Sequence, residues 1–192
     1  MIVERFRGVL SALGREDDWY RYFNITQGGF QRSFLVALGT LPAYFLIARA
    51  VEVERGRLLG DASRDIPWGI FAGVMGGFTL AFPFVAVICA TLFGVSERLR
   101  GWVIVRHWAV FFLAWFAAAL FGLYIAGAIN YATANLVGFA AWFGVLALDI
   151  RLAQKVGGFG LGGAVLVGSI ITSLGLSLIL AGLVLYLSNP PA

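Results

Sequence analysis

Four uncharged runs alternate with short charged segments along the chain. They cover 33–48, 66–96, 107–148 and 156–192 and are 16, 31, 42 and 37 residues long. A membrane-spanning helix needs about 20 mostly apolar residues, because each residue rises about 1.5 Å across a hydrocarbon core about 30 Å thick. The last three runs are therefore each long enough for at least one membrane span.

The 42-residue run is too long for a single span, since one helix of that length would reach about 63 Å. We predict two helices that turn at its only polar interruption, residues 130–135. The first run is the weakest, because its apolar stretch contains Pro42 and ends with Arg49. An arginine near a helix end can extend its stem to the head groups at low cost. A full span and a re-entrant segment both remain open there.

These patterns predict an all-α integral membrane bundle of five helices, preceded by an amphipathic interfacial N-terminal helix. Pro42 and Pro83 are expected to bend the first and second spans, because proline removes a backbone donor. The predicted parts are an interfacial segment at 1–32, one transmembrane domain at 33–188 with spans near 34–52, 68–95, 108–129, 134–151 and 160–187, and a tail at 189–192.

The N-terminal segment shows helical periodicity in its apolar positions. These positions recur at three- and four-residue spacing and are Ile2, Val3, Phe6, Val9, Leu10 and Leu13. Such a helix can lie on a membrane surface that carries anionic lipids. Docking on the protein's own surface or on a partner explains the pattern equally well. No signal peptide is expected, since the first 15 residues lack a continuous apolar core.

Basic residues predict the orientation of the bundle. Ten arginine and lysine residues fall on the side of the N-terminus and four on the other side. The positive-inside rule then places the N-terminus in the cytoplasm and the C-terminus outside. Thirteen of the 14 basic residues are arginine, which is typical of GC-rich bacterial genomes. We therefore expect a multi-pass protein of a bacterial plasma (inner) membrane.

Composition excludes several other classes of protein. Hydrophobic residues make up 60% of the chain and charged residues only 12%, against about 25% charged residues in soluble domains. Disordered chains and nucleic-acid-binding arms need far more charge. A disulfide scaffold is excluded because Cys89 is the only cysteine, and we expect it to be a small buried filler.

Small residues at four-residue spacing predict where helices pack closely. Helices in a bilayer associate through close backbone contact, since lipid tails are as apolar as leucine. The strongest stripe lies in the second span, and we expect such stripes to face other helices of the chain more often than a second copy. The predicted packing positions are Gly69, Gly73, Gly77, Ala81, Ala118, Gly122 and Gly168.

Ionisable residues at membrane depth normally mark catalysis or ion coupling, and the predicted spans hold none away from their ends. Asp149 and Arg151 are expected to form an interfacial pair, with a gate or substrate contact as the alternative. His107 lacks metal-binding neighbours. The predicted interfacial charges are Arg98, Arg100, Arg106, His107, Asp149 and Arg151. A solute path along Thr172, Ser173 and Ser177 is a further possibility. No catalytic residue, metal or cofactor is expected.

The segment Tyr22-Phe23-Asn24-Ile25-Thr26-Gln27-Gly28-Gly29-Phe30-Gln31-Arg32-Ser33-Phe34, running into Leu41-Pro42, resembles uncharacterised bacterial proteins grouped with the Yip family of five-span membrane proteins. The predicted architecture is similar to that family as well. The acidic, glycine- and proline-bearing motif of the eukaryotic members is not evident here. The resemblance implies a non-enzymatic membrane organiser or accessory subunit of unknown partner, and the small-GTPase binding of the eukaryotic members is not carried over.

Three functions remain open at this point. The leading hypothesis is an accessory or scaffold protein that assembles with other membrane proteins or with its own copies. The alternative is a small oligomeric transporter or channel for a small solute. A lipid-modifying enzyme is third, and it requires Arg98, Arg100, His107, Asp149 and Arg151 to converge. A cavity that reaches the middle of the bilayer and is lined by polar groups favours the transporter.

Overall fold

The computed structural model describes residues 2–60 and 66–188, and every described element is helical. The predicted tail at 189–192 and the loop at 61–65 lie outside the described residues. The elements are α1 (Ile2–Leu13), η1 (Trp19–Tyr22), α2 (Gln27–Leu38), α3 (Leu41–Leu59), α4 (Trp68–Leu92), η3 (Ser96–Arg98), α5 (Leu99–Ile125), α6 (Tyr131–Lys155) and α7 (Leu161–Ser188).

Five helical segments of the described chain are long and apolar enough to cross a membrane. They are Gln27–Leu59, Trp68–Leu92, Ser96–Ile125, Tyr131–Lys155 and Leu161–Gly182. The predicted all-α bundle of a multi-pass membrane protein is confirmed. The structure differs from the sequence-based boundaries at two connections.

The first span consists of two helices joined at Gly39 and Thr40. The amide of Gly39 closes α2, and Pro42 occupies the first turn of α3. A proline is well accommodated there, because the first amides of a helix have no intrahelical acceptor. The bend predicted at Pro42 is therefore a junction between helices. The crossing runs from Gln27 to Leu59, beyond both ends of the predicted 34–52.

The turn between α5 and α6 comes earlier than the predicted 130–135. Helix α5 ends at Ile125, and Gly127 takes the positive φ of 77° that an L side chain disfavours. The Asn130 side chain accepts a hydrogen bond of 2.8 Å from the Thr133 amide and caps α6. The polar residues after Asn130 thus start a helix instead of forming the turn.

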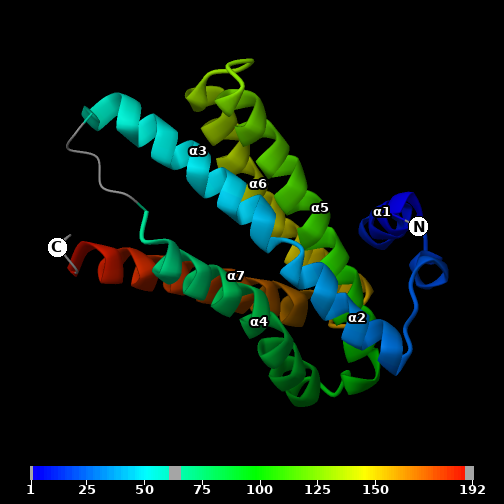
Figure 1. Ribbon diagram of the computed structural model, residues 1–192. Coiled ribbons are helices and arrows are strands. Elements are labelled where there is room, and N and C mark those ends of the chain that lie inside the picture. Colours follow the sequence, from blue (N-terminus) through cyan, green and yellow to red (C-terminus); the bar gives the residue numbers. More distant parts are fainter. Residues whose placement is uncertain (1, 61–65, 189–192) are drawn as a thin grey trace.

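Helix α5 lies at the centre of the bundle. Seven consecutive residues, 101–107, are buried, so this part of α5 has no face that contacts lipid. The main core surrounds it and draws residues from α1, α4, α6 and α7, among them Val9, Phe82, Leu152 and Val167. All spans are therefore held together at the end of the bundle near α1 (Figure 1).

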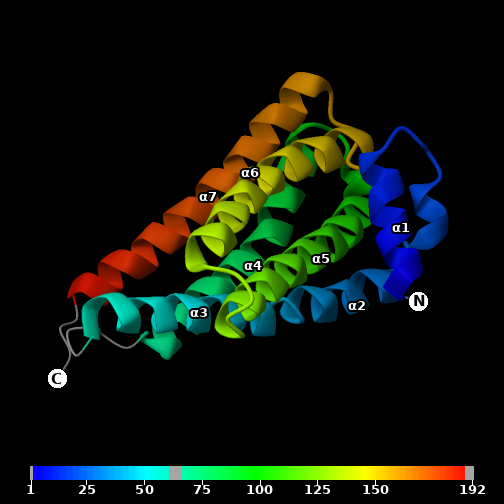
Figure 2. The ribbon, with the colours of Figure 1, turned by 90° about the horizontal axis from the view of Figure 1, so that it is seen from above.

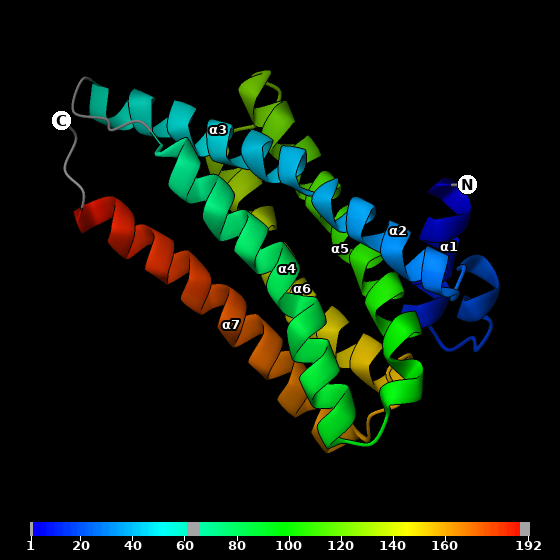
Figure 3. The same cartoon turned by 60° about the horizontal axis from the view of Figure 1, so that its bottom comes forward.

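The core is divided into smaller clusters towards the opposite end. Two smaller core clusters hold α3, α5 and α6 together there, around Ala43, Ala118 and Phe121, and neither contains a residue of α4 or α7. Helices α4 and α7 run beside each other (Figures 1 and 3), and the first turns of α4 contact α3, where the Phe45 ring lies 5.5 and 5.3 Å from the rings of Trp68 and Phe71. Pro83 lies inside α4, which changes direction along its length (Figure 1).

Glycines spaced seven residues apart form the contacts of α7. A methyl group at Gly168 would lie 2.6 Å from a side-chain atom of Ile150 in α6. A methyl group at Gly175 would lie 2.5 Å from the ring of Phe78 in α4, and a methyl group at Gly182 would lie 2.6 Å from the side chain of Val74 in α4. Among the other predicted packing positions, Ala118 is fully buried and Gly122 lies against Leu46.

The glycine stripe of α4 lies on the outer face of the helix, whereas the sequence predicts that it lies against another helix. A methyl group at Gly69, Gly73 or Gly77 would meet no atom within 4 Å. The prediction that these glycines pack against another helix of this chain is wrong for the part that the structure describes. The reason is that α4 turns Val74 and Phe78 towards α7, which leaves the glycines on its outer face. Ala81, one turn further on, is half-buried.

Helix α1 lies across the end of the bundle, beside α5 and α6 (Figure 2). Arg151 donates hydrogen bonds of 3.1 and 2.7 Å to the carbonyls of Leu13 and Gly14, and Lys155 donates one of 2.9 Å to Gly14. These cations satisfy the unpaired carbonyls at the C-terminus of α1. Docking on the protein's own surface is thus shown, although Ile2, Val3, Phe6 and Leu10 stay exposed.

Replacing Arg151 by alanine is expected to release α1, because two of the three cation–carbonyl bonds at its end are lost. Amide hydrogen exchange should rise at least about tenfold over residues 2–14, as expected for a loss of about 1.4 kcal/mol or more. Arg100→Ala is the matched control, since Arg100 is exposed at the same end of the bundle. Unchanged exchange in α1 of Arg151→Ala would show that apolar contacts alone hold this helix.

Candidate functional site: a buried ion pair at an intramembrane cleft

Arg106 of α5 and Asp149 of α6 form a buried ion pair inside the bundle. The guanidinium donates through Nε and Nη2 to the two carboxylate oxygens, at 2.6 and 3.0 Å. Arg106 is 4% exposed and Asp149 is not exposed at all. The Arg106 Cζ also lies 3.9 Å from the centre of the Phe82 ring, a cation–π contact. This two-pronged geometry fixes the position of both charges.

The pair lies well inside the spans. Arg106 is seven residues into α5 and Asp149 six residues before the end of α6, which places both about 10 Å from the helix ends. The predicted pairing of Asp149 with Arg151 is wrong, and the interfacial depth predicted for Arg106 and Asp149 stays a prediction. Asp149 instead pairs with Arg106, because the short turn after α5 brings residues 43 positions apart side by side.

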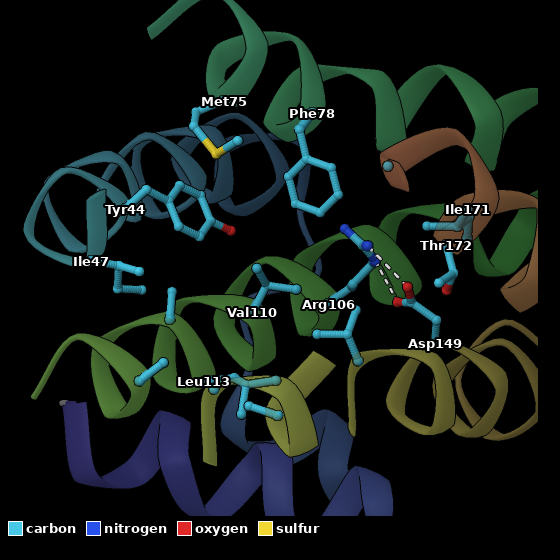
Figure 4. A pocket seen from close by; sticks show the side chains of 16 residues that line it. Tyr44, Ile47, Met75, Phe78, Arg106, Val110, Leu113, Asp149, Ile171 and Thr172 are labelled. Atoms are coloured by element: carbon cyan, nitrogen blue, oxygen red, sulfur yellow. Dashed lines mark hydrogen bonds and ion pairs between the residues drawn. The ribbon is translucent and has the colours of Figure 1, made fainter. Parts of the chain in front are cut away.

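A cavity of about 230 Å³ opens beside the ion pair. Its wall is mainly apolar and includes Val110, Leu113, Ala117 and Val145. Helices α3 to α7 all contribute to it, and Tyr44, Met75 and Phe78 stand opposite the pair (Figure 4). Arg106 and Asp149 are the only charged residues among those that line it. We call this cavity the inner chamber.

A second cavity of about 460 Å³ continues the first towards the end of the bundle opposite α1. Both cavities are lined by Tyr44, Ile47 and Met75, so they adjoin each other between α3 and α4. The second cavity reaches Arg55 and Gly182. We call it the outer chamber, and the two chambers together the cleft. From Tyr44 to Arg55 along α3 the cleft extends about 16 Å.

The predicted polar path along α7 is contradicted in part. Ser173 and Ser177 are exposed on the outside of the helix, and the Ser177 hydroxyl donates to the Ser173 carbonyl at 2.9 Å. Thr172 alone faces the inner chamber, beside Asp149 (Figure 4). Its hydroxyl oxygen is buried and has no hydrogen-bond partner among the described residues. Buried polar groups are normally paired, so this hydroxyl is available to a ligand.

His107 lies on the other side of α5 from Asp149 and is 3% exposed. Its Nδ1 is 3.0 Å from the Ser33 hydroxyl, and its ring contacts Phe34 and Phe82 edge to face. Helix α2 covers His107 through Ser33 and Phe34, and the predicted position of this histidine at the membrane interface stays a prediction. The site therefore holds more buried polar groups than the sequence suggested, with Thr40 and Thr79 near the same level.

The five residues that a lipid-modifying enzyme would need do not converge. Arg98 and Arg100 are exposed at the helix ends, Arg151 binds α1, and His107 and Asp149 have separate partners. Within residues 2–60 and 66–188, no group of three or more His, Cys, Asp and Glu side chains could hold a metal ion.

Comparisons of the chain with models of protein families, with curated proteins and with solved structures found no match.

Proposed function

We propose that the protein is a small membrane transporter that binds its substrate in the cleft, at the Arg106–Asp149 pair. The observation that carries this proposal is a charge pair buried between candidate membrane-spanning helices that borders an open chamber. Ionisable side chains at membrane depth are costly and typically mark substrate or ion pathways. Here all spans contribute to the chamber beside them, as expected of a binding site between helices.

The packing of the helices is compatible with a movement of α4 and α7 relative to α3, α5 and α6. Helices α4 and α7 share the core near α1 with the rest of the bundle, and neither contributes to the two clusters that join α3, α5 and α6 at the far end. There α4 contacts α3 through the rings of Trp68 and Phe71, which lie against Phe45. A relative motion of these two groups changes the width of the cleft without disrupting that core. Rocking of one helix group against another around a fixed site is how many transporters alternate access.

Two matched variants test binding in the cleft. Ala141 lines the inner chamber, whereas its neighbour Ala140 is exposed on the other side of α6. The protein would be purified in nanodiscs that retain native lipids, and its organic extract compared by untargeted mass spectrometry. We expect a small molecule to be retained by wild type and Ala140→Phe and lost from Ala141→Phe. Identical extracts from all three proteins would contradict the proposal.

A scaffold role is the second candidate, favoured by the open glycine stripe of α4. A stripe of small residues on an outer face allows close approach of another helix, and this fits the membrane organiser implied by the Yip-family resemblance. Gly73→Leu should then reduce co-purifying chains or self-association in mild detergent. Gly144→Leu is the control, because Gly144 is also exposed with no atom near its Cβ position. Recovery of the same single chain from all variants would exclude this role.

We place the α1 end of the bundle in the cytoplasm of a bacterial plasma membrane, with anionic lipids around α1. The basic residues gathered at this end support the orientation. The exposed apolar residues of α1, such as Phe6 and Leu10, support insertion of this helix into the head-group region.

A further inference from the structure

We propose that the substrate is lipid-like, with an uncharged, hydrogen-bond-accepting head group in the inner chamber and an apolar chain in the outer chamber. This assignment rests on the function proposed above and names the chemical class of its ligand. It follows from the charge of the inner chamber, from its unpaired donors and from the shape of the cleft.

The charge of the inner chamber disfavours an ionic head group. Arg106 and Asp149 neutralise each other in a two-pronged pair, and within residues 2–60 and 66–188 no other charged residue lines this chamber. An anionic head would lie beside the Asp149 carboxylate and compete with it for Arg106. A cationic head would face the Arg106 guanidinium. Both repulsions are strong where water is excluded, so an uncharged head is preferred.

Two unpaired donor groups face the inner chamber and match an acceptor. The Thr172 hydroxyl is buried and has no partner among the described residues. Arg106 donates to Asp149 through Nε and Nη2. Its Nη1 group makes no hydrogen bond within the described chain. A guanidinium carries five N–H donors and no acceptor. A hydroxyl or carbonyl oxygen of the substrate can therefore accept from both residues.

The outer chamber fits an apolar chain. Most of its lining residues are apolar and come from α3 and α4, and Arg55 is the only charged one among the described residues that line it. The cleft is elongated, extending about 16 Å along α3. A compact polar solute would leave this chamber unfilled, whereas a chain fills it and buries apolar surface.

Three photoactivatable probes with the same alkyl chain and a diazirine at the chain end would test this assignment. Their head groups are an alcohol, a sulfonate and a trimethylammonium. The full-length protein in nanodiscs would be irradiated with each probe, and labelled peptides quantified by mass spectrometry. We expect the alcohol to label α3 and α4 residues of the outer chamber several-fold more than either charged probe.

A matched pair of variants tests the head-group contact. Thr172→Val removes one hydroxyl at nearly constant volume and should lower cleft labelling by the alcohol about three- to tenfold, as expected for one lost hydrogen bond. Ser173→Val makes the same kind of change on the exposed side and should leave labelling unchanged. Equal labelling in both variants would overturn the assigned contact with Thr172.

The possible failures are distinguishable. Cleft labelling by the sulfonate or the ammonium probe that equals or exceeds labelling by the alcohol would overturn the uncharged head group and leave the proposed transporter intact. Absence of cleft labelling by all three probes would overturn both the ligand class and the proposed function.

Discussion

Asp149→Leu is expected to lower the free energy of unfolding by about 3–5 kcal/mol, because it leaves the Arg106 charge buried without a partner. Asp149 is fully buried and accepts two hydrogen bonds from Arg106. Reversible unfolding in mixed detergent micelles would measure the loss. Arg100→Leu is the control, since Arg100 is exposed and its replacement should change stability by no more than about 0.5 kcal/mol.

The double variant Arg106→Met/Asp149→Leu separates stability from function. Replacing both charges by apolar side chains of similar size is often neutral or stabilising, so most of the lost stability should return. Binding in the cleft should not return, because the polar end of the site is gone. A single variant as stable as wild type would contradict the buried pair, and a double variant that still binds would contradict its role.

Gly168→Ala is expected to destabilise the bundle by about 1–3 kcal/mol through overpacking. The added methyl group would lie 2.6 Å from Cγ1 of Ile150 and 3.0 Å from its backbone nitrogen. A side chain could rotate away, but the backbone of α6 cannot, so α6 and α7 must separate.

Gly162→Ala is the matched control in the same helix, because no atom lies within 4 Å of its Cβ position. It should leave stability unchanged or raise it by about 0.5–1 kcal/mol, since alanine loses less backbone entropy than glycine in a helix. Unfolding measurements on both variants would decide the matter. Equal stability of the two would show that α6 and α7 do not approach as closely as described.

The five spans could be predicted from the uncharged runs, since membrane thickness fixes the length of a span. The ion pair could not be predicted from those runs, because Arg106 and Asp149 border the longest one and were counted as its ends. A signal was nevertheless present. Opposite charges equally distant from a hairpin turn come side by side, and the midpoint of these two residues falls in the turn after Ile125.

The glycines show a similar limit of sequence reasoning. Four-residue spacing correctly indicated Gly168, which contacts Ile150 of α6. The glycines that contact α4 side chains are Gly175 and Gly182, which follow Gly168 at seven-residue spacing. Which face of α4 meets α7 depends on the tilt of both helices, and no local pattern determines it. The cleft results from the same tilt of the helices. Its volume, and the meeting of its two chambers at Tyr44, could therefore be found only in the structure.

A density map of the protein in native-lipid nanodiscs, determined by cryo-electron microscopy with a rigid binding partner, is the most direct test of a ligand in the cleft. We expect elongated density between α3 and α4 that ends beside Arg106 and Thr172. A map with no space between Tyr44 and Met75, and no density beside Arg106 and Thr172, would contradict the account.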